Sequence, residues 1–341
     1  MTNKKTIYDI DISGKTVLVR VDYNVPFKPN TTEISDDSRI KMSLPTIRYL
    51  VQERCKIILC SHLGRPRGKF DKTLQMLPIS QRLSEILEVP IIQAQDCIGP
   101  SVSEAVYNMA PGEIMFLENL RFHSGEEDND SNFSASLVGN MIDIFVNDAF
   151  GAAHRAHASI EGVTHFLPSV AGLLMTQELE MLGTILNNPQ KPFLAIIGGS
   201  KVSDKIGILH NLTKKVDTLI IGGGMAATFL KASGLEIGTS SIEKDQVFEA
   251  EKLLRSAQDT GLNILLPEDV ITADTFSSEA KDKIFPVSKI PSKSVIMDIG
   301  PETILSFEKS IHKAKTVLWN GPMGVFEWNQ FASGTSSIAR A

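Results

Sequence analysis

The sequence is poor in cysteine and has no long apolar run. Its 341 residues include 3 cysteines (Cys55, Cys60 and Cys97), none in a CxxC pair, which argues against a disulfide framework or a cysteine-rich zinc site. No apolar stretch approaches the roughly 20 residues that a membrane-spanning helix needs. The opening MTNKKTIYDI lacks the apolar segment of a secretory signal. We therefore expect a protein of the cytoplasm, with no membrane partner.

An excess of positive charge is also missing. The formal net charge is −6 and aromatic residues make up 6% of the chain, whereas nucleic-acid surfaces usually combine many cations with aromatic side chains. The segment RPRGKF (65–70) brings three cations together without interleaved aromatic residues. We therefore expect no nucleic-acid partner, and any cationic cluster in this chain should be local.

Short apolar runs alternate with helical patterns along the whole chain. The runs are typical of strands buried on both faces, and residues 43–54 and 78–88 have apolar residues at helical spacing. This alternation predicts an α/β fold with two doubly wound, parallel-sheet (Rossmann-like) domains. The expected strands lie within residues 16–26, 56–66, 113–122 and 142–151 of the first half and 193–199, 218–225, 262–270 and 316–324 of the second, with 294–301 as an addition.

One helical segment is expected to join the two domains. Residues 176–189, TQELEMLGTILNNP, form an amphipathic pattern that ends at Asn-Asn-Pro. We expect a hinge helix over 173–189, between an N-terminal domain of residues 1–172 and a C-terminal domain of residues 190–341. The acidic segment GEEDND (125–130) is expected to be a solvated loop, and TSSIARA (335–341) to begin a helix.

Basic and amide side chains follow the apolar runs of the first half. In open parallel sheets ligands bind beyond the carboxyl ends of the strands, and guanidinium groups hold carboxylates and phosphates through paired hydrogen bonds. Arginines at successive strand ends therefore predict a site for a small, multiply anionic substrate. The candidate residues are Asp22, Asn24, Arg39, His62, Arg65, Arg121 and Arg155.

Structural interpretations compete with this one. A single arginine commonly pairs with a carboxylate on a solvated face. His154 and His157, three residues apart, could share a helix face, but no third metal ligand lies nearby in the sequence. We interpret both histidines as hydrogen-bonding neighbours of Arg155.

Glycine-rich turns follow three apolar runs of the second half. GGSKVSDKIG (198–207) is expected to open a helix on which Lys201 and Lys205, at positions i and i+4, point the same way. Backbone N–H groups at such a helix start favour phosphate. GGGMAA (222–227) and WNGPMGVFE (319–327) would offer bare backbone to a purine or ribose. Each turn alone is equally consistent with tight strand-to-helix packing, but together with the lysines the turns predict a nucleotide site.

GGGMAA also fits the dinucleotide pattern GxGxxA. No acid follows at a strand end about twenty residues later, where a ribose-binding Asp or Glu belongs. The alternative hypothesis of a nicotinamide-dependent oxidoreductase therefore rests on this one motif alone.

A polyanion site in one half and a nucleotide site in the other predict phosphoryl transfer between two small molecules. Such transfer depends on in-line positioning and on neutralising negative charge. Since no carboxylate or histidine is placed as a general base, a carboxylate acceptor fits best, because it is already charged. Closure about the hinge helix would bring the substrates together and exclude water.

In its ordered motifs the chain resembles the phosphoglycerate kinase family. The resemblance runs from RVDYNVP (20–26) to the last residue and rests on DDSRI, SHLGRP, LENLRF, NDAFGAAHRAHAS, GGSKVSDKI, GGGMAATFL and WNGPMGVFE. It implies a monomeric, hinge-bending glycolytic kinase. Such an enzyme transfers a phosphoryl group between 1,3-bisphosphoglycerate and ADP, giving 3-phosphoglycerate and Mg-ATP.

The resemblance also implies a role for each matching residue. The seven strand-end residues of the first half would bind phosphoglycerate, and Arg39, Lys201 and Lys205 would be catalytic, steadying the phosphoryl group. The nucleotide would be held by Gly199, Lys201, Lys205, Gly223, Gly224, Gly300, Asn320, Gly321 and Glu327.

The family pattern continues with motifs that these 341 residues lack. One is a Gly-Gly-Asp-[Ser/Thr] turn whose aspartate holds the nucleotide's Mg²⁺, and another is a Ser-Thr-Gly-Gly segment. The resemblance therefore implies a second domain that is incomplete at its C-terminal end, with Mg²⁺ arriving with the nucleotide and no protein ligand for it identifiable in this chain. The alternative hypothesis is a binding module of the same fold with impaired catalysis.

Overall fold

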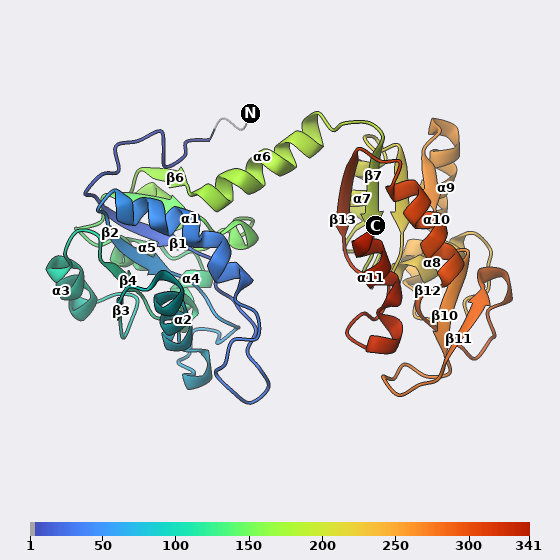
Figure 1. The fold of residues 1–341 in the computed structure, drawn as a ribbon, viewed down its shortest axis with the longest axis horizontal. Coiled ribbons are helices and arrows are strands. Elements are labelled where there is room, and N and C mark those ends of the chain that lie inside the picture. The colour runs from blue at the N-terminus through green and yellow to red at the C-terminus, as the bar shows by residue number, and fades with distance from the viewer. Residues whose placement is uncertain (1–3) are drawn as a thin grey trace. The chain divides into compact units, whose positions relative to one another are not determined.

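The computed structural model describes residues 4–341 of the chain. They form two compact units whose boundary lies between Gly183 and Thr184, inside helix α6 (Leu173–Asn187) (Figure 1). Each unit has its own sheet and its own hydrophobic cores. Within the described residues, no helix combines the length and the apolar composition needed to cross a membrane.

The first unit is built on a six-stranded sheet in which every neighbouring pair is parallel. Its strands are almost wholly apolar because both faces of the sheet are covered. Val17 and Val19 of β1 belong to one core, whereas Leu18 between them belongs to the other. In spatial order the strands are β3 (Ile91–Gln93), β4 (Ile114–Phe116), β2 (Lys56–Cys60), β1 (Thr16–Arg20), β5 (Ile144–Asn147) and β6 (Ser169–Ala171).

Helices complete both cores of the first unit. Ile47 of α1 and Leu83 of α2 pack with Val17, while Val106 of α3 and Leu137 of α5 pack on the opposite face. The predicted double winding is therefore present. The helices are α1 (Ser38–Gln52), α2 (Leu77–Leu87), α3 (Pro100–Asn108), α4 (Ser124–Glu127) and α5 (Ser131–Val138), followed by α6.

The second unit repeats this plan on a four-stranded parallel sheet of order β13-β7-β8-β9. Ile197 of β7 packs with Phe229 of α8 on one face, and Ile196 packs with Phe307 of α10 on the other. The strands are β7 (Phe193–Ile197), β8 (Thr218–Ile221), β9 (Asn263–Leu265) and β13 (Thr316–Asn320), and the helices are α7 (Ile206–Leu212), α8 (Met225–Ala232), α9 (Val247–Thr260), α10 (Pro301–Ile311) and α11 (Ser333–Arg340).

Two strand predictions in this unit were wrong. Residues 262–270 do not form one strand, because Pro267 cannot donate to a ladder and separates β9 from β10 (Asp269–Ala273). The run 294–301 does not extend the parallel sheet. Its strand β12 (Val295–Ile299) pairs antiparallel with β10, which also pairs antiparallel with β11 (Asp282–Pro286). The α/β class with parallel sheets is confirmed, and a small antiparallel sheet is added to it.

The acidic segment 125–130 is not a solvated loop. Glu126 in α4 is fully buried, Glu127 Oε1 lies 3.1 Å from Arg121 Nε, and Asp130 accepts a 2.7 Å hydrogen bond from the Phe133 N–H at the start of α5. For Glu126 the prediction failed because the groups that donate to its carboxylate belong to Ser159, which is distant in the sequence. The helices expected at 176–189 and 335–341 are present as α6 and α11.

Candidate functional site

The carboxyl ends of the adjacent strands β4, β2, β1 and β5 carry the predicted anion-site residues of the first unit. Asp22 follows β1, and its Oδ2 accepts a 2.6 Å hydrogen bond from Arg39 Nη1 in the first turn of α1. A Cβ at Gly151, after β5, would lie 2.5 Å from Asp22 Oδ2. A larger residue at position 151 would therefore displace the Asp22 carboxylate, and three separate segments meet at Asp22.

A second chain of contacts joins Asn24 to Arg121. Asn24 Oδ1 accepts a 2.9 Å hydrogen bond from the Gly64 N–H, and the Gly64 carbonyl accepts one of 2.7 Å from Arg121 Nη1. The Arg121 side chain is almost fully buried, and Glu127 lies beside its Nε. The guanidinium group is thus held by a carbonyl and a carboxylate. Arg65, next to Gly64, is exposed.

His62 lies at the end of β2, beside the buried side chain of Arg20. Arg20 Nη2 is 3.1 Å from His62 Nδ1. Burial, followed by the charges of Arg20 and Arg121, lowers the pKa of His62 to about 2. The imidazole is therefore neutral at neutral pH, and the 3.9 Å approach of its Nδ1 to Asp22 Oδ1 is not an ion pair. Among residues 4–341, Asp22 Oδ1 is buried without a hydrogen-bond partner, so its capacity to accept a hydrogen bond is unused within the protein.

Arg155 belongs to the same cationic group. After burial, its charge is among the causes that lower the pKa of both His62 and Arg121. The expected helix face for His154 and His157 is absent, because these residues lie in an irregular turn. His157 Nδ1 is 3.7 Å from Glu126 Oε1, so His157 has a buried glutamate as a charged neighbour.

The glycine turns of the second unit interlock through their backbones. The Gly199 N–H donates to the Pro322 carbonyl at 3.1 Å. A Cβ on Gly223 would lie 2.5 Å from Gly199 N, and one on Gly321 would lie 2.3 Å from the Gly198 oxygen. Packing between the turns therefore requires glycine at 223 and 321. At Gly199, with φ +109°, a Cβ would meet no atom within 4 Å, so this backbone is open to a ligand.

The remaining nucleotide-site candidates differ in exposure. Gly224, before α8, is exposed, and so is Glu327. Gly300, before α10, is buried, and its Cβ would lie 2.3 Å from the Asp269 carboxylate. That carboxylate accepts a 2.8 Å hydrogen bond from the Thr303 N–H. Packing at the start of α10 therefore explains why position 300 is a glycine.

The predicted helix face for Lys201 and Lys205 was wrong. Helix α7 begins only at Ile206, with Lys205 as its N-cap, and Lys201 lies in an irregular loop. Lys205 Nζ nevertheless donates to Asn320 Oδ1. The structure therefore brings Lys205 and Asn320 together at the carboxyl ends of β7 and β13, although not by helical spacing.

A carboxylate stabilises the lysine loop, which is the segment 198–205 between β7 and α7 that carries Lys201 and Lys205. Glu243, which precedes the 3-10 turn Lys244–Gln246, accepts hydrogen bonds from the N–H groups of Val202 (2.5 Å) and Ser203 (3.0 Å) and from the Ser203 hydroxyl. The hydrogen bond from the Ser203 hydroxyl is the largest cause of a lowered pKa of Glu243, and the charge of Lys201 adds to it. The carboxylate of a distant segment therefore satisfies the N–H groups of Val202 and Ser203, and this loop does not need to become helical to satisfy them.

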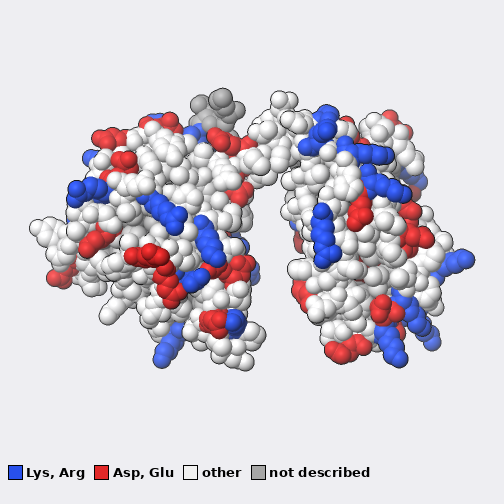
Figure 2. All heavy atoms as spheres, in the orientation of Figure 1, with Lys and Arg blue, Asp and Glu red and all other residues white. Residues whose placement is uncertain are grey.

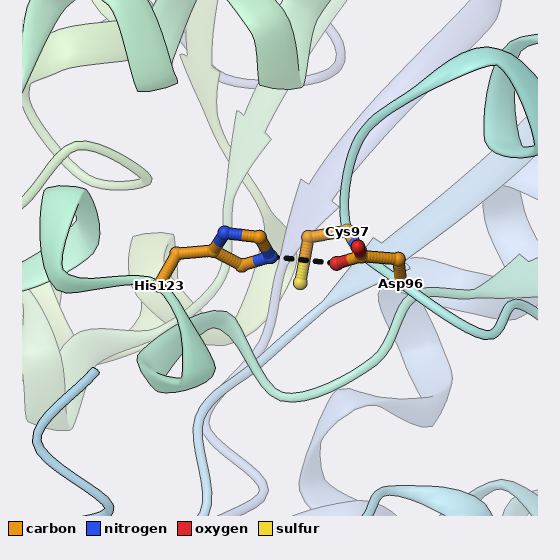
Figure 3. A group of neighbouring side chains, drawn as sticks. All are labelled: Asp96, Cys97 and His123. Atoms are coloured by element: carbon orange, nitrogen blue, oxygen red, sulfur yellow. Dashed lines mark hydrogen bonds and ion pairs between the residues drawn. The ribbon is translucent and has the colours of Figure 1, made fainter. Parts of the chain in front are cut away.

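One group of potential metal ligands lies outside both clusters. Asp96, Cys97 and His123 have ligand atoms within 4.8 Å of one another (Figure 3). Asp96 Oδ1 and His123 Nε2 are 2.6 Å apart, a hydrogen-bond distance. The Cys97 thiol donates to the Glu118 carbonyl at 2.9 Å, and burial raises its pKa well above the usual value. These contacts explain the group as a hydrogen-bonded pair beside a buried thiol.

The surface charge is mixed. On the face shown in Figure 2, Lys and Arg alternate with Asp and Glu over both units. This face carries no broad single-sign patch of the kind that binds a nucleic-acid backbone.

The sequence model of a family described as Phosphoglycerate kinase matches residues 7–341. The chain belongs to the phosphoglycerate kinase family. A phosphoglycerate kinase of Pelotomaculum thermopropionicum is 51% identical over 337 residues, which cover 99% of this chain and 85% of that protein. One of Moorella thermoacetica is 49% identical over 338 residues, again 99% of this chain and 85% of that protein. Family membership overturns the oxidoreductase alternative that rested on GGGMAA.

Solved structures of the family have the same fold. The structure of phosphoglycerate kinase from Coxiella burnetii matches with a TM-score of 0.82 at 39% identity, covering 99% of this chain and 84% of that one. The enzyme from Pyrococcus horikoshii OT3 matches with a TM-score of 0.84 at 29% identity, covering 98% and 85%.

Sequence reasoning missed three residues that organise these phosphoglycerate kinase clusters. Arg20 interrupts the apolar run VLVRV, and a cation inside a buried strand was the signal available for it. Glu126 and Glu243 lie in ordinary acidic segments, and nothing local marks them. Their roles appear only with the hydrogen bonds that they accept.

Proposed function

We propose that this chain catalyses phosphoryl transfer between 1,3-bisphosphoglycerate and ADP, giving 3-phosphoglycerate and ATP. Family membership and relatives at about half identity support the reaction. The observation that carries the proposal is the convergence of Asp22, Arg39, His62 and Arg121 at adjacent strand ends of the first unit. The proposal assigns this cluster to phosphoglycerate and the second unit to the nucleotide.

In the first unit, buried and exposed cations have different tasks. Arg121 is held by the Gly64 carbonyl and Glu127, so it presents a preorganised charge to a phosphate or carboxylate. Asp22 Oδ1, an acceptor without a partner in the protein, would accept from the substrate hydroxyl, and the neutral His62 is a hydrogen-bond donor. Asn24, Arg65 and Arg155 complete the binding residues. Arg39, whose side chain is 49% exposed, is free to reach the transferring phosphoryl group.

In the second unit, the exposed backbone at Gly199 and Gly224 and the ammonium groups of Lys201 and Lys205 would receive the nucleotide. Lys205, already beside Asn320, would neutralise charge on the phosphates. Gly223 and Gly321 would act by shaping the turns, with Gly300 and Glu327 at the periphery. Mg²⁺ would enter as part of the nucleotide substrate, bound to its phosphates.

The chemistry requires no general base from the protein. The nucleophile in the ATP-forming direction is a phosphate oxygen of ADP, and in the reverse direction it is the carboxylate of 3-phosphoglycerate. Both are already charged, so in-line alignment and cationic neutralisation supply the catalysis. The two bound substrates must meet for transfer, and we assign that approach to bending about α6.

The test is a coupled assay of this chain with 3-phosphoglycerate and Mg-ATP, in which the acyl phosphate product is reduced with NADH. We expect steady turnover that needs both substrates. Titration calorimetry with each substrate alone gives the second readout. Binding of 3-phosphoglycerate without any turnover would contradict the kinase proposal and leave only a binding module.

The proposal also covers the setting in which the enzyme works. We infer a monomer of the cytoplasm whose partners are its small-molecule substrates, and neither nucleic acid nor a membrane. Its three cysteines, all free and buried, are compatible with a reducing compartment. Light scattering at micromolar concentration would test the monomeric state.

A further inference from the structure

The side chain of Arg20 is a buried cation whose hydrogen bonds all have a fixed direction. It is 1% exposed. Its Nε lies 2.9 Å from Ser159 Oγ, its Nη2 lies 3.1 Å from His62 Nδ1, and its Nη1 donates to the Val21 carbonyl. A guanidinium group only donates. His62 Nδ1 must therefore accept, and the single proton of the neutral imidazole lies on Nε2.

Glu126 supplies the charge on the other side of this network. Its carboxylate accepts hydrogen bonds from the Ser159 hydroxyl at 2.7 Å and from the Ser159 N–H at 3.0 Å. The Ser159 hydroxyl has one proton. Because that proton goes to Glu126, the Ser159 oxygen is left to accept from Arg20 Nε. The direction of each hydrogen bond is thus fixed: Arg20 donates to both His62 and Ser159, and Ser159 donates to Glu126.

The network needs Glu126 to be an anion. Burial raises the pKa of Glu126, but His157, the charge of Arg20 and the hydrogen bonds from Ser159 outweigh it, so the pKa lies below the usual value. Burying an unpaired guanidinium group is costly. With Glu126 neutral, Arg20 would gain by turning toward solvent or toward another acceptor, and His62 Nδ1 would lose its donor.

We propose that Glu126 is a positioning residue of the phosphoglycerate site, acting through Ser159 and Arg20 to hold His62 as the tautomer that carries its proton on Nε2. This inference rests on the proposed function of the His62 cluster. Its consequence is that His62 always presents a donor to the anionic substrate. An imidazole free to exchange tautomers would present an acceptor part of the time and repel the same oxygen.

The decisive measurement is made on the ligand-free protein. Two-bond ¹⁵N–¹H spectra distinguish protonated from unprotonated imidazole nitrogens, and His62→Asn identifies the His62 signals. We expect the wild type to show a protonated Nε2 and an unprotonated Nδ1, unchanged from pH 7.5 to pH 5.5. In Glu126→Gln we expect both nitrogens to shift toward values averaged between tautomers.

Activity gives the second readout. Glu126→Gln is expected to raise KM for 3-phosphoglycerate about tenfold, the size of a lost charged hydrogen bond, while KM for Mg-ATP stays within a factor of two. The matched control is Asp128→Asn in the same acidic segment, whose side chain is exposed. It should change neither the spectra nor KM.

A further variant keeps the test valid if Glu126→Gln does not fold. Ser159→Ala removes only the bridging hydroxyl and should give the same averaging of the His62 signals. Wild-type His62 signals in either folded variant would overturn the proposal, as would a wild-type His62 protonated on Nδ1. Because the spectra need no substrate, failure of this inference is distinguishable from failure of the kinase proposal, which the turnover assay measures.

Discussion

Arg39 differs from the other cations of the first unit in being both restrained and accessible. Its Nη1 is held by Asp22 at 2.6 Å, while its side chain remains 49% exposed. The buried Arg121, by contrast, is tied to a carbonyl and a carboxylate. At the scale of single residues, the exposed Arg39 can therefore follow a phosphoryl group as it moves, whereas the buried Arg121 can only hold a bound substrate.

Arg39→Ala should lower kcat by about 10³-fold, the order of effect of an aligned cation on phosphoryl transfer. KM for 3-phosphoglycerate should change much less, because the buried cations remain. Steady-state kinetics measure both constants. Arg48→Ala, an exposed arginine on the same helix, is the control and should behave as wild type. A kcat for Arg39→Ala within a few-fold of wild type would show that Arg39 is misassigned.

Asp298 is a single residue whose ionisation should be visible in stability. It lies within β12, and its carboxylate accepts hydrogen bonds from the N–H groups of Gly334 (2.7 Å) and Ile299 (2.9 Å). Burial outweighs these bonds and raises the pKa of Asp298 to about 6. Between roughly pH 4 and pH 6 the folded protein thus holds a proton that the unfolded chain releases, so this group makes the free energy of unfolding fall as the pH rises.

Asp298→Asn should remove that pH dependence. Relative to the variant, the wild type should lose up to about 3 kcal/mol between pH 4 and pH 7, since one pKa unit corresponds to about 1.4 kcal/mol. Urea unfolding, followed by tryptophan fluorescence at each pH, measures the free energy of unfolding of both proteins. Asp259→Asn, at an exposed position of α9, should keep the wild-type slope. Parallel pH profiles for Asp298→Asn and wild type would contradict the prediction.

At the scale of elements, the segment between β7 and α7 shows how a neighbour can override local preference. Its sequence favours a helix start, but Glu243 accepts the N–H groups of Val202 and Ser203. Those groups are then satisfied outside a helix, and α7 begins later, at Ile206. The placement of Lys201 and Lys205 thus depends on a carboxylate some forty residues away in the chain.

Glu243→Gln should loosen this loop and weaken nucleotide binding. We expect KM for Mg-ATP to rise about 10-fold or more, because hydrogen bonds to a charged acceptor contribute about 1.5–3 kcal/mol, and KM for 3-phosphoglycerate to stay unchanged. Kinetics with each substrate varied in turn measure the two constants. Glu236→Gln is the control, since Glu236 is highly exposed and pairs only with Lys231 at the surface. Equal rises in both KM values would argue for general destabilisation instead.

At the scale of the whole molecule, the two units have separate cores, and both tryptophans, Trp319 and Trp328, lie in the second. Tryptophan fluorescence therefore reports on the second unit alone. A ligand stabilises whichever unit binds it. The assignment of phosphoglycerate to one unit and nucleotide to the other can then be tested without reference to catalysis.

ADP at about 100 times its Kd should raise the midpoint of thermal unfolding, followed by tryptophan fluorescence, by ~5–10 °C, which is the shift expected for about 2.7 kcal/mol in a unit of this size. The same excess of 3-phosphoglycerate should leave that midpoint within about 1 °C. Circular dichroism, which reports on both units, should respond to either ligand. A fluorescence midpoint that moves with 3-phosphoglycerate alone would contradict the assignment.

Much of the fold and part of the site could be predicted from local patterns. Near-continuous apolar runs separated by amphipathic segments suffice for buried parallel strands between helices. Since parallel strands end at one edge, the meeting of Asp22 with Arg39 and of Asn24 with Gly64, after β2, follows from order along the chain. The ordered motifs alone carried the resemblance to phosphoglycerate kinases.

Local patterns did not reveal which charges would be buried or which turns would pack. Glu126 looked like a solvated acid because Arg20 and Ser159 are distant in sequence. The division of 262–270 between two sheets also depends on pairing with remote strands.

By itself, then, the sequence determined the central strands of the two parallel sheets, their buried faces and the chemical types gathered at their ends, because these depend on the spacing of neighbouring residues. Only the tertiary structure decided which tautomer His62 adopts, where the lysine loop ends and which glycines serve packing. Each of these depends on burial and on hydrogen-bond partners from distant segments, and the free energy of a charge or a polar group is set by those surroundings rather than by its neighbours in the chain.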